Sequence, residues 1–178
     1  MFDFASMSPT EIVGQIIGFC AVAMGVISYQ AKTYKGIMAF QVAFSSFWVI
    51  HFILLGDPTG ALLNFVAFVR NFAYALKHKF PKSLKIALPY LVCAAFIGAT
   101  VFTFTTPMSI IPCVGSLVAT VALYISNERI LRILSLIVSA SWLTYGIYVS
   151  SIPSALNEIL LIISIIVALI RYRKVEKT

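Results

Sequence analysis

The sequence predicts an all-α membrane protein with seven transmembrane helices, arranged as two parallel three-helix repeats joined by a linker helix. Three observations lead to this prediction: the composition, the distribution of basic residues, and a duplicated pattern of Trp and Asn. Of the 178 residues, 61% are hydrophobic and 11% are charged, whereas soluble domains carry about 25% charged residues. A water-soluble fold of this length cannot bury so much apolar surface, so a soluble protein is excluded.

Seven apolar runs account for the helices, because a helix needs about 20 apolar residues to cross a hydrocarbon core of about 30 Å. Pro58, Pro107 and Pro153 each fit the first turn of the next helix, where the missing N–H is not needed. The N-terminus lacks the basic flank of a signal peptide, so we expect the first run to be a retained helix. The runs are residues 12–31, 36–55, 58–77, 86–104, 108–126, 130–149 and 152–171.

The basic residues test this count. If successive runs cross in alternate directions, twelve of the 13 Lys and Arg residues fall on one side, and Arg70 lies inside a run. The positive-inside rule then predicts a cytoplasmic C-terminus and an N-terminus outside. The twelve are Lys32, Lys35, Lys77, Lys79, Lys82, Lys85, Arg129, Arg132, Arg171, Arg173, Lys174 and Lys177. We interpret the cluster from Lys77 to Lys85 and the tail from Arg171 as anchors for anionic lipid headgroups of the bilayer and not as a nucleic-acid site.

The two halves of the chain share a pattern. Trp48 is followed by Asn64, and Trp142 by Asn157, each about 16 residues later and across a short outer turn with a nearby Pro. Three crossings reverse the chain, so one linker helix lets the second unit run parallel to the first. Repeats related by an axis along the membrane normal place a substrate site between the halves, near the midplane. The single membrane domain, 1–178, then divides into a first repeat (12–77), a linker helix (86–104) and a second repeat (108–171).

Several short motifs lie in the two halves of the chain: HFILLG at 51–56, Gly60-Ala61, Asn64, Arg70, Pro112, Gly115, Trp142 and Glu158. With these motifs the chain resembles the bacterial YgjV-type inner-membrane protein family over about residues 12–172. A broader similarity is to the SWEET, SemiSWEET and PQ-loop transporters, which have a 3-1-3 or three-helix plan. These resemblances imply a SWEET-like fold in the bacterial inner membrane. The chain departs from the transporters because it has no Pro-Gln pair and no Pro in its first, second and sixth runs.

Four residues are the predicted binding set: Asn64, Asn157, Trp48 and Trp142. They lie about 8–10 Å below the outer ends of their helices, and similar positions line the pocket of the sugar transporters that the chain resembles. Amides and indole rings suit a small polar solute with hydroxyls or amides, a sugar-like or other neutral metabolite. The alternatives are that each Asn bonds a neighbouring helix and that each Trp belongs to an interfacial belt.

Two ionisable residues are candidates for coupling. His51 follows Trp48 by three residues and shares its helical face, so it either couples a proton or is a satisfied buried histidine. Glu158 lies deep enough that its charged form is costly. It either carries a coupling proton or bonds a neighbour.

Two further polar residues lie in the third run. Arg70 is about 18 Å from the outer end of its helix, and a permanently charged guanidinium needs an acceptor. Glu158 is one hypothetical partner, and helix-end carbonyls or a lipid phosphate are the others. Asn71 shares the face of Asn64 and extends the polar path toward the cytoplasm.

These features favour transport of a small polar solute by alternating access, and the alternative is a non-transporting receptor or partner protein. An enzyme is not expected, because paired intramembrane aspartates, a histidine cluster and a GxSxG motif are all missing from the sequence. No cofactor or metal is expected either, since Cys20, Cys93 and Cys113 are far apart. A GxxxG motif at Gly14 and Gly18 predicts close helix packing inside the bundle or between copies, so a homo-oligomer stays open.

Overall fold

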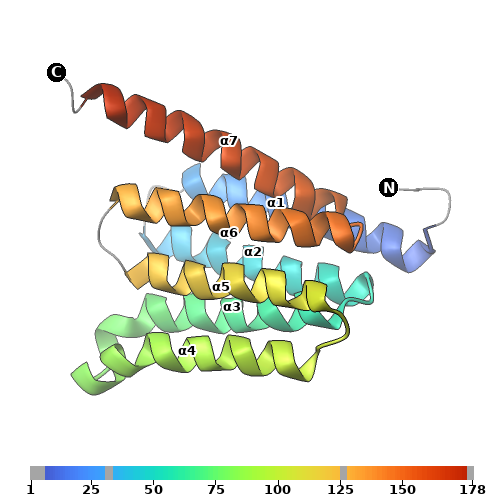
Figure 1. Cartoon of the computed structure of the whole chain (residues 1–178), viewed down its shortest axis with the longest axis horizontal. Helices are drawn as coiled ribbons and strands as arrows, with labels where there is room; N and C mark the ends of the chain where they lie inside the picture. Colours follow the sequence, from blue (N-terminus) through green and yellow to red (C-terminus); the bar gives the residue numbers. More distant parts are fainter. Residues whose placement is uncertain (1–6, 31–33, 125–127, 176–178) are drawn as a thin grey trace.

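Helices make up most of the computed structural model, which describes residues 7–30, 34–124 and 128–175 (Figure 1). Within these residues there are seven α-helices, two short 3-10 helices and no β-strand. The predicted number of helices is therefore confirmed. The elements are α1 (Pro9–Gln30), α2 (Tyr34–Leu54), α3 (Pro58–Leu76), η2 (Lys77–Lys79), α4 (Lys82–Phe102), η3 (Pro107–Ser109), α5 (Ile110–Tyr124), α6 (Glu128–Tyr148) and α7 (Ile152–Val175).

The first helix begins three residues before the predicted run, and a local hydrogen-bond motif explains why. The Ser8 backbone N–H donates to Glu11 Oε2 at 2.7 Å, and the Glu11 N–H donates to Ser8 Oγ at 3.3 Å. This reciprocal pair is a capping box, which satisfies N–H groups that a helix start leaves free. Pro9 occupies the first helical position, where its ring is preorganised for a helix.

Many large apolar side chains lie on the outside of the bundle and many polar side chains lie inside it, which is the reverse of the distribution in a soluble protein. Large apolar side chains such as Phe102 and Ile163 are exposed, while Gln15 and Thr120 are buried. An exposed apolar surface of this extent suits a lipid environment. Three stretches of the described residues are long and apolar enough to cross a membrane, and that all seven helices do so stays a prediction. The three stretches are Pro9–Ile27, Lys82–Phe102 and Ile152–Ile170.

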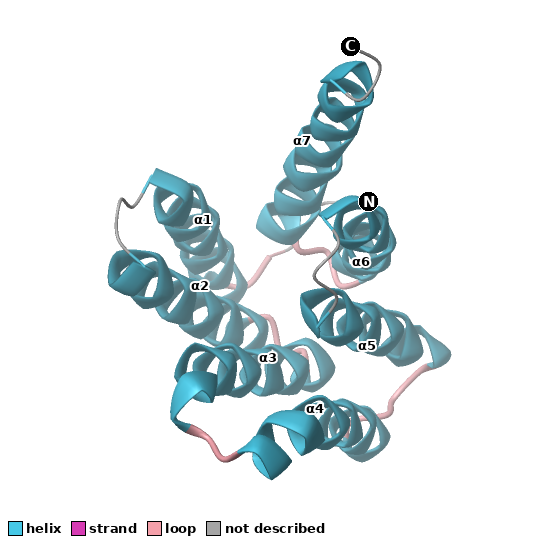
Figure 2. Cartoon of the chain, turned by 90° about the vertical axis from the view of Figure 1, so that its left-hand side faces the viewer, coloured by secondary structure: helices cyan, strands magenta, loops and turns pink. Residues whose placement is uncertain are grey.

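The helices follow one another around a ring, with α4 outside it (Figure 2). In the first half α2 packs against both α1 and α3, and in the second half α6 packs against both α5 and α7. The ring is closed by contacts of α1 with α7 and of α3 with α5, while α4 packs on α3 and α5. Odd-numbered helices run in one direction and even-numbered helices in the other (Figure 1). We call the end with the α2–α3 and α6–α7 turns the outer end, after the predicted orientation.

The GxxxG motif packs helices inside the bundle. A Cβ on Gly14 would lie 3.1 Å from Leu54 Cβ of α2, and a Cβ on Gly18 would collide with Pro153 of α7 and lie 2.7 Å from His51 Nδ1. Only glycine lets α1 approach both neighbours this closely.

Gly18→Ala is therefore expected to lower the free energy of unfolding by about 1–3 kcal/mol, because the added methyl forces α1 away from α2 and α7. Thermal unfolding of the purified protein in detergent measures the effect. Gly98→Ala is the matched control, since Gly98 lies inside α4 with no atom within 4 Å of an added Cβ. It should be neutral or stabilising, as Ala favours a helix more than Gly does. Equal destabilisation by both variants would contradict the packing role of Gly18.

Candidate functional site

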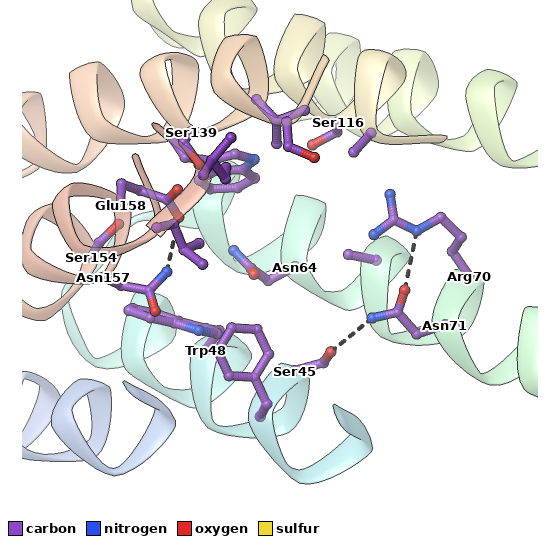
Figure 3. A pocket seen from close by; sticks show the side chains of 18 of the residues that line it. Ser45, Trp48, Asn64, Arg70, Asn71, Ser116, Ser139, Ser154, Asn157 and Glu158 are labelled. Atoms are coloured by element: carbon purple, nitrogen blue, oxygen red, sulfur yellow. Dashed lines mark hydrogen bonds between the residues drawn. The ribbon is translucent and has the colours of Figure 1, made fainter. Parts of the chain in front are cut away.

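A cavity of about 510 Å³ lies inside the ring of helices. Its lining comes from α2, α3, α5, α6 and α7 and therefore from both halves of the chain (Figure 3). Pockets that take small ligands have volumes of this order. The structure places seven of the eight predicted residues on the wall of this cavity: Trp48, Asn64, Arg70, Asn71, Trp142, Asn157 and Glu158.

The two predicted asparagines face the cavity from opposite halves. Asn64 Nδ2 donates to the Gly60 carbonyl of its own helix at 2.9 Å. Asn157 Nδ2 donates to Oε1 of the adjacent Glu158 at 3.0 Å. Among the described residues neither amide bonds a neighbouring helix, which was the alternative interpretation. Their amide groups line the cavity without holding the bundle together (Figure 3).

The two tryptophans lie at the outer part of the cavity. Trp48 is only 4% exposed, and its ring meets those of Phe52 at 5.9 Å and His51 at 5.3 Å between centroids. Trp142 is half-buried, and its ring centroid lies 6.2 Å from those of Phe52 and Tyr145. Trp48 therefore does not belong to a lipid-facing belt, and both rings present apolar surface to the cavity.

The two outer turns have the same backbone hydrogen bonds at a constant residue offset. Gly56 N–H donates to the Ile53 carbonyl, and Ser150 N–H donates to the Ile147 carbonyl. Gly56 and Ser150 also share a left-handed backbone, with φ of +70° and +56°. This conformation favours glycine over residues with a side chain.

The caps that follow these turns match as well. Gly60 N–H donates to Asp57 Oδ2 at 3.1 Å, and Ser154 N–H donates to Ser151 Oγ at 3.2 Å. Each acceptor is the residue that follows the left-handed position.

This register corrects the pairing of the asparagines. The offset that relates Gly56 to Ser150 also relates Trp48 to Trp142, but it relates Asn64 to Glu158 and not to Asn157. Aligning the halves on Pro58 and Pro153 shifts the comparison by one residue, because these prolines occupy different positions after their turns. Asn64 and Glu158 are therefore the residues at equivalent depth.

His51 does not line the cavity. It is fully buried, with Nδ1 2.7 Å from the Gly14 carbonyl oxygen and Nε2 2.7 Å from Ser151 Oγ. Both ring nitrogens thus have a partner, which agrees with the interpretation as a satisfied histidine. That His51 couples a proton to transport stays a prediction, and these contacts do not favour it.

Like the hydrogen bond between His51 and Ser151, a second side-chain hydrogen bond joins the two halves at the outer end. The Tyr145 hydroxyl donates to Asp57, with distances of 2.7 Å to Oδ1 and 2.9 Å to Oδ2. By the offset above, Tyr145 corresponds to His51 and Asp57 to Ser151. Each middle helix therefore bonds the turn of the opposite half, and we call these two contacts the reciprocal bonds.

Asp57 lies in the α2–α3 turn, outside the helices. Burial raises the pKa of its carboxyl above the ordinary value, and the bonds from Tyr145 and from the backbone N–H groups of Gly60 and Thr59 partly oppose this.

Gln15 adds a third link at the outer end. Its Nε2 donates to the Ser150 carbonyl at 2.9 Å, and its Oε1 accepts from the Ile152 N–H at 3.1 Å. α1 is thereby fastened to the α6–α7 turn. Together with the reciprocal bonds, this contact closes the outer end with hydrogen bonds between the two halves.

The cavity continues toward the inner end with a polar lining. Arg132, Ser135 and Ser164 lie on its wall, and Arg132 is four residues from the start of α6. The cavity thus extends from the aromatic rings near the outer turns to within about one helical turn of the inner end of α6.

Arg70 and Asn71 lie on the cavity wall and bond neutral groups. Arg70 Nε donates to Asn71 Oδ1 at 3.2 Å, and Nη1 lies 3.4 Å from Thr120 Oγ1 of α5. Asn71 Nδ2 donates to Ser45 Oγ at 3.3 Å and so links α3 to α2. The hypothetical ion pair of Arg70 with Glu158 is not formed, and Figure 3 shows the two residues at opposite ends of the view. Asn71 therefore links helices in addition to lining the cavity.

Comparison with known proteins identifies the family. The model of the family Imp-YgjV, bacterial inner membrane protein, matches residues 12–176. The chain belongs to this family. The resemblance to YgjV-type proteins is thereby confirmed, and the YgjV-family chain is a bacterial inner membrane protein. No curated protein and no solved structure matches it significantly.

The prediction from sequence missed the residues that close the outer end. Asp57, Tyr145, Gln15 and Ser151 were not among the candidates, although the first three are polar residues near the ends of apolar runs. A strict offset between the halves, without a gap at the prolines, was the signal that would have paired Tyr145 with His51.

Proposed function

We propose that this YgjV-family protein transports a small polar solute, a sugar-like or other neutral metabolite, by alternating access. One observation carries the proposal: Asn64 and Asn157 present amide groups to one cavity from opposite halves, and neither amide links helices. An amide that holds no helix in place is available to bind a solute. Trp48 and Trp142 would supply the flat apolar surfaces on which a sugar ring stacks. The proposal assigns no catalytic step to the cavity.

The proposal includes two parallel three-helix repeats, as in SWEET-type transporters. It is supported by the common packing order, in which α2 and α6 are the middle helices. It is also supported by the shared hydrogen bonds of the outer turns. In this arrangement α4 is the linker helix that restores the direction of the chain.

The described conformation would be open to the inside. Most of the described hydrogen bonds between the halves lie at the outer end, where His51 bonds Ser151 and Tyr145 bonds Asp57. Deeper in the bundle, Arg70 of α3 also contacts Thr120 of α5. The polar lining continues toward the inner end through Ser135 and Arg132. Alternating access would break the outer bonds and close the inner end around a fixed site.

We expect seven membrane crossings, with the N-terminus outside and the C-terminus in the cytoplasm. Alkaline phosphatase fused to the C-terminus should be inactive in cells, because it folds only in the periplasm, whereas a fluorescent protein that requires the cytoplasm should be bright. As a control, phosphatase fused after Asp57, in a predicted outer turn, should be active. The reverse pattern would overturn the orientation.

Flux through proteoliposomes tests the transport proposal. The purified protein should move at least one labelled solute from a panel of sugars, amino acids and nucleosides, and the same solute should raise the midpoint of thermal unfolding because it binds the folded state. A receptor would show the thermal shift with no flux. A folded protein that neither binds nor moves any member of a broad panel would favour the role of a partner protein instead.

A further inference from the structure

Arg70 is a buried cation on the cavity wall. Its side chain is 9% exposed, and the guanidinium extends from α3 to the cavity side (Figure 3). An arginine is always charged in proteins, so it requires acceptors wherever it lies. A buried charge without a counter-charge is costly in a low-dielectric interior.

The contacts of Arg70 satisfy it only in part. Of its five N–H groups, one donates to Asn71 Oδ1 at 3.2 Å and another reaches Thr120 Oγ1 at 3.4 Å. One face of the guanidinium lies over the Phe96 ring, 5.7 Å from its centroid. All three partners are neutral.

No described carboxylate pairs with Arg70. The acidic side chains that the structure describes are Glu11, Asp57 and Glu158. Glu11 bonds Ser8, Asp57 bonds Tyr145 and Glu158 accepts from Asn157. The described residues therefore supply no counter-charge for Arg70, although its side chain borders the cavity.

From this geometry we infer that the solute carries an acidic group, a carboxylate or phosphate, which binds Arg70. The guanidinium edge matches two oxygens of either group. Asn64 lies six residues before Arg70 on α3, about 9 Å along the helix axis. A solute with a hydroxylated or amide-bearing body and an acidic end would reach both residues. The inference rests on the proposed transport function and replaces a neutral solute by an acidic one.

Matched neutral and acidic solutes test this inference. Binding of glucose, gluconate and glucose 6-phosphate, and of glutamine and glutamate, is measured by calorimetry on the full chain in phosphatidylcholine nanodiscs. At least one acid should bind about tenfold more tightly than its neutral partner. Arg70→Gln should weaken the binding of that acid about tenfold to a hundredfold, and it should change the affinity for the neutral partner by less than about twofold. Arg70→Lys keeps the positive charge but lacks the paired N–H donors of the guanidinium, so it should give an intermediate loss of acid affinity. This variant also serves as a check if Arg70→Gln does not fold.

Arg129→Gln is the matched control, because it removes the same charge from an exposed position of α6. It should leave acid binding unchanged. A second arm uses phosphatidylglycerol nanodiscs. If the acid binds there as tightly as in phosphatidylcholine, the solute is the source of the anion. If the anionic lipid displaces it, a lipid phosphate occupies Arg70 and the inference is overturned.

The remaining outcomes separate the inference from the proposed function. Flux of a neutral solute with no preference for its acid would overturn the inference and leave transport standing. Equal losses of acid and neutral binding in Arg70→Gln would also overturn it, since the residue would then act on the fold. Absence of binding and flux for every solute, in a protein with a sharp thermal transition, would overturn both.

Discussion

Replacing Asn64 and Asn157 together by alanine is expected to abolish solute flux while the protein stays folded. Each single variant should lower the flux about tenfold, because leaving a solute group in the cavity without its hydrogen-bond partner costs about 1–3 kcal/mol of binding free energy. The double variant should lose at least a hundredfold if the two sites act independently. The measurement is the initial rate of uptake into proteoliposomes of equal protein content.

The fold should tolerate this double change. Asn64 bonds a carbonyl of its own helix and Asn157 bonds its neighbour in sequence, so no contact between helices is lost. The free energy of unfolding should change by less than about 1 kcal/mol.

Phe65→Ala with Leu156→Ala is the matched control for the asparagine pair. Both side chains neighbour an asparagine in sequence but are exposed on the outside of the bundle. This control should retain flux. If it loses as much flux as the asparagine variant does, or if the asparagine variant transports normally, the cavity is not the solute site.

Tyr145→Phe is expected to open the outer end of the cavity. The change removes the hydroxyl that donates to both carboxylate oxygens of Asp57 and keeps the aromatic ring. A bond to a charged group contributes about 1.5–3 kcal/mol, so its loss should shift the population toward the outward-open state by about tenfold or more. The pKa of Asp57 should also rise further, because the Tyr145 bond opposes the effect of burial.

Cysteine labelling measures this shift. Asn157→Cys places a thiol on the cavity wall in a chain whose three native cysteines are replaced by alanine. A membrane-impermeant maleimide added outside should label it about tenfold faster in Tyr145→Phe than in the parent. Tyr148→Phe is the matched control, since the Tyr148 hydroxyl contacts Thr106 at 3.4 Å within the second half of the chain. Labelling that is equally slow in both variants would show that the Asp57 bond does not hold the outer end closed.

The helices were predictable because hydropathy and turn residues agree along most of the chain. The largest differences lie at helix ends, at the starts of α1 and α4 and at the end of α7, where the backbone stays helical beyond the apolar run. α4 begins at Lys82, four residues before the predicted run, because basic residues such as Lys82 and Lys85 can occupy a first turn that projects beyond the hydrocarbon core. α1 begins at Pro9 because Ser8 and Glu11 cap it.

The candidate site was predictable only where a residue type recurs in the two halves. Trp48 and Trp142 recur at the structural offset, and the cavity has both on its wall. The partners of Arg70 were not predictable, because Thr120 and Phe96 come from helices that no local pattern brings near α3. Arg70 follows Asn64 by six residues and therefore lies on a different face of α3, yet its long side chain reaches the same cavity.

The reciprocal bonds have a consequence for the order in which the protein is assembled. They join residues 88 and 100 positions apart, and Gln15 reaches across 137 positions to Ile152. If the helices enter the membrane in the order of synthesis, none of these contacts can form before the α6 and α7 segments arrive. Until then the cavity beside Asn64 and Arg70 lacks the walls that α6 and α7 provide. With this order of insertion, the cavity would be completed last, when α6 and α7 dock laterally against the helices already in the bilayer.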